Sequence, residues 1–219
     1  MIRFRTTHQR LLFFLFTLLA IVVVDGFFTG LVYDTIFSFA YCLILVQGPY
    51  IIYRRRWHWL VFSMLIFSSW GFQLLAKLLA SSSLGILSSI NWTIFNGYVA
   101  WLMLRYTLRT ERVGRDHLLV VVITYILIGL TYACAYTTLE YLDPQSFNID
   151  FATAISEVEI WQQLLYFSYM TLGSVGYGDI LPQTHFSRML AISEAIAGIM
   201  FMAIFVARMV SLYAAERDR

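Results

Sequence analysis

The sequence predicts an all-helical membrane protein, and two observations carry that prediction. Hydrophobic residues make up 60% of the 219 residues, whereas charged residues make up only 13%. A soluble domain of this size could not keep so much apolar surface away from water, so its main solvent must be lipid. The apolar residues also gather into runs of about 20, the length that crosses a hydrocarbon core about 30 Å thick.

Six such runs follow one another along the chain. They cover residues 11–31, 33–53, 57–79, 84–104, 118–139 and 189–213. A seventh stretch, residues 160–172, is too short to span a membrane and is followed by a glycine-rich segment. Runs of that length are typical of re-entrant segments, whose irregular backbone is tolerated where protein or a water path covers it. The sequence therefore predicts six crossings, with one re-entrant segment before the last.

The basic residues indicate the orientation. If the N-terminus is cytoplasmic and each run crosses once, all of the 15 Lys and Arg residues except Lys77 and Arg188 fall on the cytoplasmic side. Such a bias is the usual orientation rule, so we expect a multi-pass protein of the cell membrane with both termini in the cytoplasm. The short loops favour a prokaryotic inner membrane. A net charge of +2 gives no argument for a nucleic-acid partner.

The most specific motif lies between the fifth and sixth runs, where the chain reads Ser174-Val175-Gly176-Tyr177-Gly178-Asp179. This segment resembles the pore loop of the potassium channel family, whose filter usually reads Thr-Val-Gly-Tyr-Gly-Asp. The resemblance covers roughly residues 118–213 and is strongest over 166–182. It implies an all-α membrane protein with six transmembrane helices, a re-entrant pore helix and a selectivity filter, assembled as a fourfold tetramer. It also implies passive, potassium-selective conduction.

Elementary chemistry explains why such a filter needs these residue types. A potassium ion that sheds its water requires a cage of oxygens, and backbone carbonyls supply one without a fixed charge. The resemblance assigns those carbonyls to Ser174, Val175, Gly176 and Tyr177. Glycine adopts positive φ at little cost, which suits Gly176 and the following Gly178. One loop supplies a quarter of each ring, so the chain is expected to form a homotetramer, with potassium as its permeating ligand and no other cofactor.

Other residues near the motif are expected to support it. Trp161, Tyr166 and Phe167 could form an aromatic collar around the filter. Thr171 lies near the end of the short helix, whose negative dipole end would favour a cation in a central cavity. Asp179 could attract cations at the outer mouth or act as a strut bonded to the short helix.

Two residues of the last run carry alternatives. Glu194 is its one acid, and ionisable residues in the hydrocarbon region are usually functional. It could be a pH-sensitive or cation-attracting group, or it could make a structural hydrogen bond behind the filter. Gly198 lies where the family places a gating hinge, and close helix packing explains a glycine there equally well.

Two departures from the family pattern leave other functions open. Ser174 replaces the usual Thr, and Gly173 stands where Thr is common. These changes allow a non-selective cation channel, whereas a non-conducting regulatory subunit would have no need for the intact motif. The four histidines lie near the ends of the runs without partners at metal or nucleophile spacing, so no enzyme is expected.

The expected domain organisation has four parts. Residues 1–104 form a four-helix transmembrane domain, 105–117 a basic cytoplasmic linker, 118–213 the pore domain and 214–219 a short cytoplasmic tail. The first part occupies the position of a voltage sensor. Residues 84–104 contain no Lys or Arg, however, so strong voltage gating is not expected. The linker arginines are expected to contact anionic lipid, namely Arg105, Arg109, Arg112 and Arg115.

Overall fold

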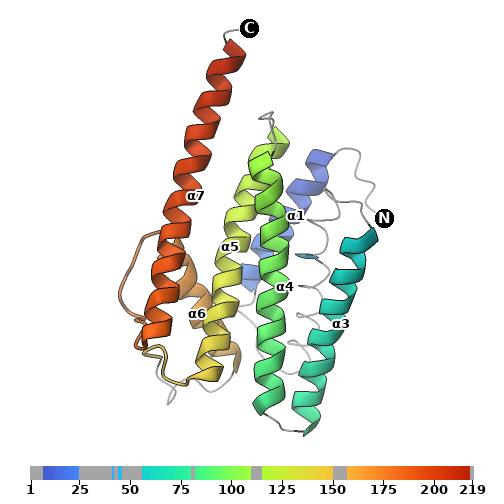
Figure 1. Cartoon of the computed structure of the whole chain (residues 1–219), viewed down its shortest axis with the longest axis vertical. Helices are drawn as coiled ribbons and strands as arrows, with labels where there is room; N and C mark the ends of the chain where they lie inside the picture. The colour runs from blue at the N-terminus through green and yellow to red at the C-terminus, as the bar shows by residue number, and fades with distance from the viewer. Residues whose placement is uncertain are drawn as a thin grey trace.

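The computed structural model is all-helical in the residues that it describes, which are 7–24, 41, 44, 45, 56–79, 82–109, 115–149 and 157–217. Its helices, with the labels of Figure 1, are α1 (Thr7–Val24), α3 (Arg56–Leu79), α4 (Ser82–Arg109), α5 (Arg115–Leu142), α6 (Glu157–Leu172) and α7 (His185–Arg217). The run expected at 33–53 lies outside the described residues, apart from Tyr41, Ile44 and Leu45.

The long helices pack side by side along one direction. Helix α4 packs against both α3 and α5, while α5 also contacts α1, α6 and α7. In Figure 1, α7 runs beside α5 and extends beyond the other helices at its C-terminal end. The short α6 lies near the other end, where α5 ends and α7 begins. Helix α5 is therefore the common support of the bundle and of the short helix.

Two apolar clusters hold these contacts. The larger joins α1, α4 and α5 through buried side chains such as Phe14, Phe95 and Leu127. The smaller joins α5 to α6 through Tyr136 and Leu164, together with Phe147 from the loop that follows α5. Buried side chains of this size each contribute on the order of 2 kcal/mol relative to exposure in water, and in lipid the gain comes mainly from close packing.

Two of the described helices are long and apolar enough to cross a membrane, Asp116–Leu142 and His185–Ser211. Two shorter apolar helical stretches occur at His8–Ala20 and Leu60–Phe72. The helices match the expected fifth and sixth runs, between which the short α6 lies. The all-helical prediction is thus confirmed for the described residues, and the total of six crossings remains a prediction.

Several helix ends differ from the expected boundaries. Helix α4 continues to Arg109 and α5 begins at Arg115, so both enter the linker expected at 105–117. The guanidinium of Arg105 lies over the Trp101 ring, 5.3 Å from its centroid, and this contact supports the added turn. Helix α7 continues to Arg217 and takes in most of the expected tail. Arginine and glutamate are good helix formers, so a helix need not stop where its apolar run stops.

The start of α7 is fixed by a reciprocal cap. The Thr184 hydroxyl accepts a hydrogen bond from the Ser187 amide at 3.3 Å, and the Ser187 hydroxyl oxygen accepts one from the Thr184 amide at 3.1 Å. This pattern satisfies amides that the first helical turn leaves without partners. It fixes the point at which the chain turns from the preceding loop into α7.

Candidate functional site

The glycine-rich motif lies between the short helix α6 and the long helix α7. We call residues 174–179 the GYG segment. Three residues of this segment have positive φ, namely Ser174 (55°), Gly176 (58°) and Gly178 (78°), whereas Val175 and Tyr177 do not. Backbone that alternates in this way turns successive peptide planes in the same sense. The carbonyl oxygens can then line one side of the chain, as a ring of cation ligands requires.

Backbone hydrogen bonds hold the start of the GYG segment to the last turn of α6. The Ser174 amide donates to the Thr171 carbonyl at 3.0 Å, and the Val175 amide donates to the Met170 carbonyl at 2.8 Å. Gly173 suits a close approach, because an added Cβ would lie 3.0 Å from the Tyr169 carbonyl oxygen, tighter than ordinary van der Waals contact. Its own amide donates to that oxygen at 3.0 Å. The absence of a side chain at Gly173 therefore permits a tight junction.

Tyr166 on α6 supports the C-terminal part of the GYG segment. Its ring stacks on the ring of Tyr177, with centroids 6.4 Å apart and planes inclined by 7°. Its hydroxyl donates to the Asp179 carboxylate at 2.8 Å. The second carboxylate oxygen of Asp179 accepts from the Ile180 amide at 3.0 Å. Of the two roles open to Asp179, this geometry is that of a strut bonded to the short helix.

The three aromatic residues expected to form one collar occupy three different environments. Tyr166 reaches the GYG segment, as described above. Phe167 is buried on another side of α6 and packs edge-to-face with Tyr136 and Phe147. Trp161 is half-buried and packs against the cluster of α1, α4 and α5. Within one chain, the structure therefore brings only Tyr166 to the segment.

The chain that leaves the GYG segment is tied to the loop after α5. The Asn148 side-chain amide donates to the Asp179 carbonyl at 3.2 Å, and its oxygen accepts from the Leu181 amide at 2.5 Å. An isolated antiparallel bridge joins Phe147 to Pro182. The carboxylate of Glu140, at the end of α5, accepts from the amides of Gln145 and Phe147 at 2.7 and 3.1 Å. Helix α5 thus anchors the far end of the segment through its own loop.

Behind the GYG segment, α6 is hydrogen-bonded to α5 and packed against α7. Tyr125 donates its hydroxyl hydrogen to the Leu172 carbonyl at 3.0 Å, and Tyr169 donates to the Ile126 carbonyl at the same distance. Gly198 of α7 presses directly on the end of α6, since a Cβ there would lie far inside van der Waals contact of the Leu172 carbonyl. This contact supports the packing role of Gly198.

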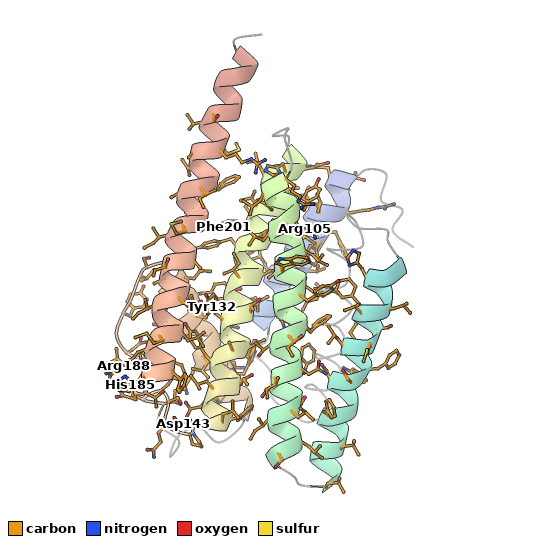
Figure 2. The ribbon with its side chains drawn as sticks, viewed as in Figure 1. Arg105, Tyr132, Asp143, His185, Arg188 and Phe201 are labelled. Atoms are coloured by element: carbon orange, nitrogen blue, oxygen red, sulfur yellow. The ribbon has the colours of Figure 1, made fainter. Side chains whose placement is uncertain are left out.

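Glu194 of α7 is fully buried and bonds to both neighbouring helices. Its two carboxyl oxygens contact the Tyr136 hydroxyl of α5 and the Ser168 hydroxyl of α6, the second at 2.5 Å. In Figure 2, Tyr132 on α5 faces α7, and its hydroxyl lies 3.1 Å from the Ser193 hydroxyl, next to Glu194. Three helices therefore meet at a polar contact behind the GYG segment.

Sequence reasoning missed several of these partners. Tyr125 bonds to the short helix and Asn148 bonds to the GYG segment, and neither contact was expected. Nor was it expected that Tyr136 of α5 and Ser168 of α6 would both bond to Glu194. Ser168 offered a signal, because a hydroxyl within a short apolar helix needs a partner. Asn148 offered none, since it lies in a polar loop where an asparagine is ordinary.

Polar and charged side chains lie at both ends of the bundle. Figure 2 places Arg105 near the end from which α7 extends, and Asp143, His185 and Arg188 at the end that holds α6 and the GYG segment. No group of three or more His, Cys, Asp or Glu side chains in the described ranges could hold a metal ion.

Two long apolar helices with a short helix and an alternating backbone segment between them are the architecture of a helical membrane channel. Residues 120–215 match the family model described as "Ion channel". The chain is 35% identical over 102 residues to Protein LctB of Bacillus caldotenax and to Protein LctB of Geobacillus stearothermophilus. Each match covers 46% of this chain and 75% of the relative. The chain belongs to the ion channel family.

The pair formed by Tyr166 and Asp179 gives a pH-dependent prediction. The hydrogen bond from Tyr166 lowers the pKa of the Asp179 carboxyl below its ordinary value, and the same bond raises the pKa of Tyr166 to about 12. A carboxyl with a lowered pKa stabilises the folded state above its ordinary pKa and loses that effect as the pH falls through the lowered value. Acid should therefore loosen the C-terminal end of the GYG segment.

Tyr166→Phe removes the donor, so we expect the acid midpoint of ion flux through reconstituted protein to move to higher pH. Tyr132→Phe is the matched control, because that hydroxyl contacts Ser193 rather than Asp179. The midpoint is obtained for both variants by recording ion flux over a range of pH. Equal midpoints in Tyr166→Phe and Tyr132→Phe would exclude the strut role of Asp179.

Proposed function

We propose that this chain is one subunit of a homotetrameric, potassium-selective channel that conducts potassium passively. One observation carries the proposal, namely the positive φ angles at residues 174, 176 and 178 in a segment held directly behind a short helix. A strand built in this way offers carbonyl oxygens without a fixed charge. Such ligands replace the hydration shell of a potassium ion and still let it leave.

The proposed ion ligands are the carbonyls of Ser174, Val175, Gly176 and Tyr177. The side chains of Val175 and Tyr177 would point away from the carbonyl rings. The Tyr177 ring stacks on the ring of Tyr166 of α6. The C-terminal end of α6 lies at Leu172, next to the segment. The aligned peptide dipoles of α6 place a partial negative charge at this end, which favours a cation on the approach to the segment. Potassium is the only ligand that the proposal requires.

A tetramer follows from the single GYG segment, because one strand supplies a quarter of each carbonyl ring. The apolar surface of α7 supports such an assembly. A row of its large apolar side chains is exposed in the single chain: Phe186, Met189, Ile192, Ile196, Ile199, Met200, Met202, Ile204, Val206 and Val210. A patch of this length requires lipid or protein to cover it. Residues at three- and four-residue spacing can face a neighbouring subunit while others face lipid.

The orientation and the other helices complete the proposal. We place both termini in the cytoplasm, with six crossings of a prokaryotic inner membrane and the GYG segment on the outer side. Arg105 and Arg109 lie in the last two turns of α4, where they can contact anionic headgroups, and Arg112 and Arg115 follow. Because the fourth apolar run contains no Lys or Arg, conduction should depend only weakly on voltage.

Flux and mass measurements test this proposal together. The purified chain has a mass of 25.4 kDa, so a tetramer should give about four times that value by light scattering after correction for detergent. Vesicles that hold the protein should release potassium down its gradient, and matched vesicles loaded with sodium should release far less. A monomeric or dimeric particle would refute the tetramer, and equal release of both ions would support the non-selective alternative.

A further inference from the structure

Glu194 lies in an environment that does not suit a charged carboxylate. Its side chain is fully buried in α7, within a helix that is long and apolar enough to cross a membrane. No ion pair joins it to a basic side chain within the part of the chain that the structure describes. Burial of an unpaired charge is costly, so the group needs either full hydrogen bonding or a proton.

The hydrogen bonds around Ser168 decide between these states. The Ser168 hydroxyl oxygen lies 2.8 Å from the Gly129 carbonyl oxygen and 2.5 Å from a Glu194 carboxyl oxygen. A serine hydroxyl has one hydrogen, and a carbonyl oxygen can only accept. If Glu194 were ionised, Ser168 would face two acceptors with one hydrogen, and one of these close oxygen pairs would be left without a proton between them.

A proton on Glu194 removes this conflict. The Tyr136 hydroxyl donates to one carboxyl oxygen, and the protonated oxygen of Glu194 donates to the Ser168 hydroxyl oxygen. Ser168 then uses its one hydrogen to donate to the Gly129 carbonyl. Each of these three oxygen–oxygen contacts then holds one hydrogen. The hydrogen bonds run in one direction, from Tyr136 of α5 through α7 and α6 and back to α5.

We propose that Glu194 is a neutral carboxylic acid and a positioning residue that fixes α6 against both long helices by donating to Ser168. Ser168 precedes Gly173 by little more than one helical turn, so its position sets that of the GYG segment. The consequence for conduction rests on the proposed channel function. The hydrogen-bond arrangement itself does not.

Glutamine distinguishes the neutral state from the ionised one. A Gln amide offers one donor and one acceptor, as a neutral carboxylic acid does, so Glu194→Gln can donate to Ser168 and accept from Tyr136. An ionised Glu194 would accept from both neighbours, and a Gln in its place would direct its NH₂ at a donor. Glu194→Ala removes both hydrogen bonds and leaves a cavity.

We expect Glu194→Ala to lower the ratio of potassium to sodium flux by about tenfold, the effect of losing a buried hydrogen bond next to the ion path. Glu194→Gln should keep most of the wild-type flux ratio, and Ser168→Ala should lower that ratio as much as Glu194→Ala does. If Glu194→Gln lowers the flux ratio as much as Glu194→Ala does, the proposal that Glu194 is neutral is wrong.

Infrared difference spectroscopy keeps the proposal testable if the alanine variants do not assemble. The wild-type spectrum minus that of Glu194→Gln, at neutral pH, should contain the C=O stretching band of a protonated carboxyl. Carboxylate bands in its place would overturn the proposal. This measurement needs no ion flux, so failure of the channel function and failure of the Glu194 assignment can be told apart.

Discussion

Gly178→Ala is expected to abolish the preference for potassium over sodium while leaving the helical bundle intact. Gly178 has φ of 78°, and an alanine in that region costs about 1–2 kcal/mol. Within one chain, no atom beyond the two neighbouring residues lies within 4 Å of the position that a Cβ would take, so the penalty there comes from the backbone rather than from a clash. In a tetramer the strain is repeated four times, or about 4–8 kcal/mol, and rotation of the peptide would relieve it.

The permeability ratio, measured in a planar bilayer, tests this expectation. The matched control is Gly85→Ala, because Gly85 lies within α4, its φ is not positive, and its added Cβ also meets no atom within 4 Å. The control should keep the wild-type ratio. A conducting Gly178→Ala protein with unchanged potassium selectivity would exclude the GYG segment as the selectivity filter.

Gly198→Ala is expected to destabilise the contact between α7 and α6 and to reduce potassium conduction strongly. The new Cβ would overlap the Leu172 carbonyl oxygen, which is backbone at the end of α6 and already accepts a hydrogen bond from Tyr125. Overpacking costs about 1–3 kcal/mol, and because the overlapped atom is backbone and cannot swing away, we expect the upper part of that range, above the gain of about 1 kcal/mol that alanine brings to a helix interior. The displaced α6 would carry the start of the GYG segment with it.

Thermal unfolding in detergent, together with vesicle flux, separates the packing role of Gly198 from a hinge role. Packing predicts a lower unfolding temperature and lower flux for Gly198→Ala, whereas Gly85→Ala should be neutral or slightly stabilising. A pure hinge predicts altered gating with unfolding unchanged or raised, because alanine stiffens a helix. That second result would contradict the close-packing explanation.

The helices were predictable because their signal is local. Apolar runs of about 20 residues gave the positions of α5 and α7, and the shorter run gave α6. The ends of the helices were less predictable, since Arg105 and Arg109 continue α4 where hydrophobicity alone predicts a loop. The positive φ of Gly176 and Gly178 was also expected, because glycine readily adopts that conformation.

The partners of the candidate site could not be predicted, because they come from distant parts of the chain. Glu194 contacts Tyr136, which precedes it by 58 residues, and no spacing rule relates positions on separate helices. Trp161 and Phe167 looked equivalent to Tyr166 in sequence, and their different orientations around α6 direct them to separate clusters. The sequence leaves two roles for Asp179, and the hydrogen bond from the Tyr166 hydroxyl favours that of a strut.

Helix α7 also contacts α4, which no sequence pattern suggested. The guanidinium of Arg208 donates to the carbonyls of Thr107 and Leu108 at the end of α4, the first at 3.3 Å. A cation at a helix C-terminus is stabilised by the partial negative charge of the free carbonyls. The C-terminal part of α7 is thereby joined to α4 near the end of the bundle opposite the GYG segment.

The reversal potential under a potassium and sodium gradient tests the central claim most directly. Purified protein is placed in a planar bilayer with potassium on one side and sodium on the other, and the voltage of zero current is recorded. A potassium-selective channel predicts a reversal potential near the potassium limit, at high positive or negative voltage according to the side that holds potassium. A reversal potential near zero would contradict potassium selectivity and would establish a channel that passes both ions.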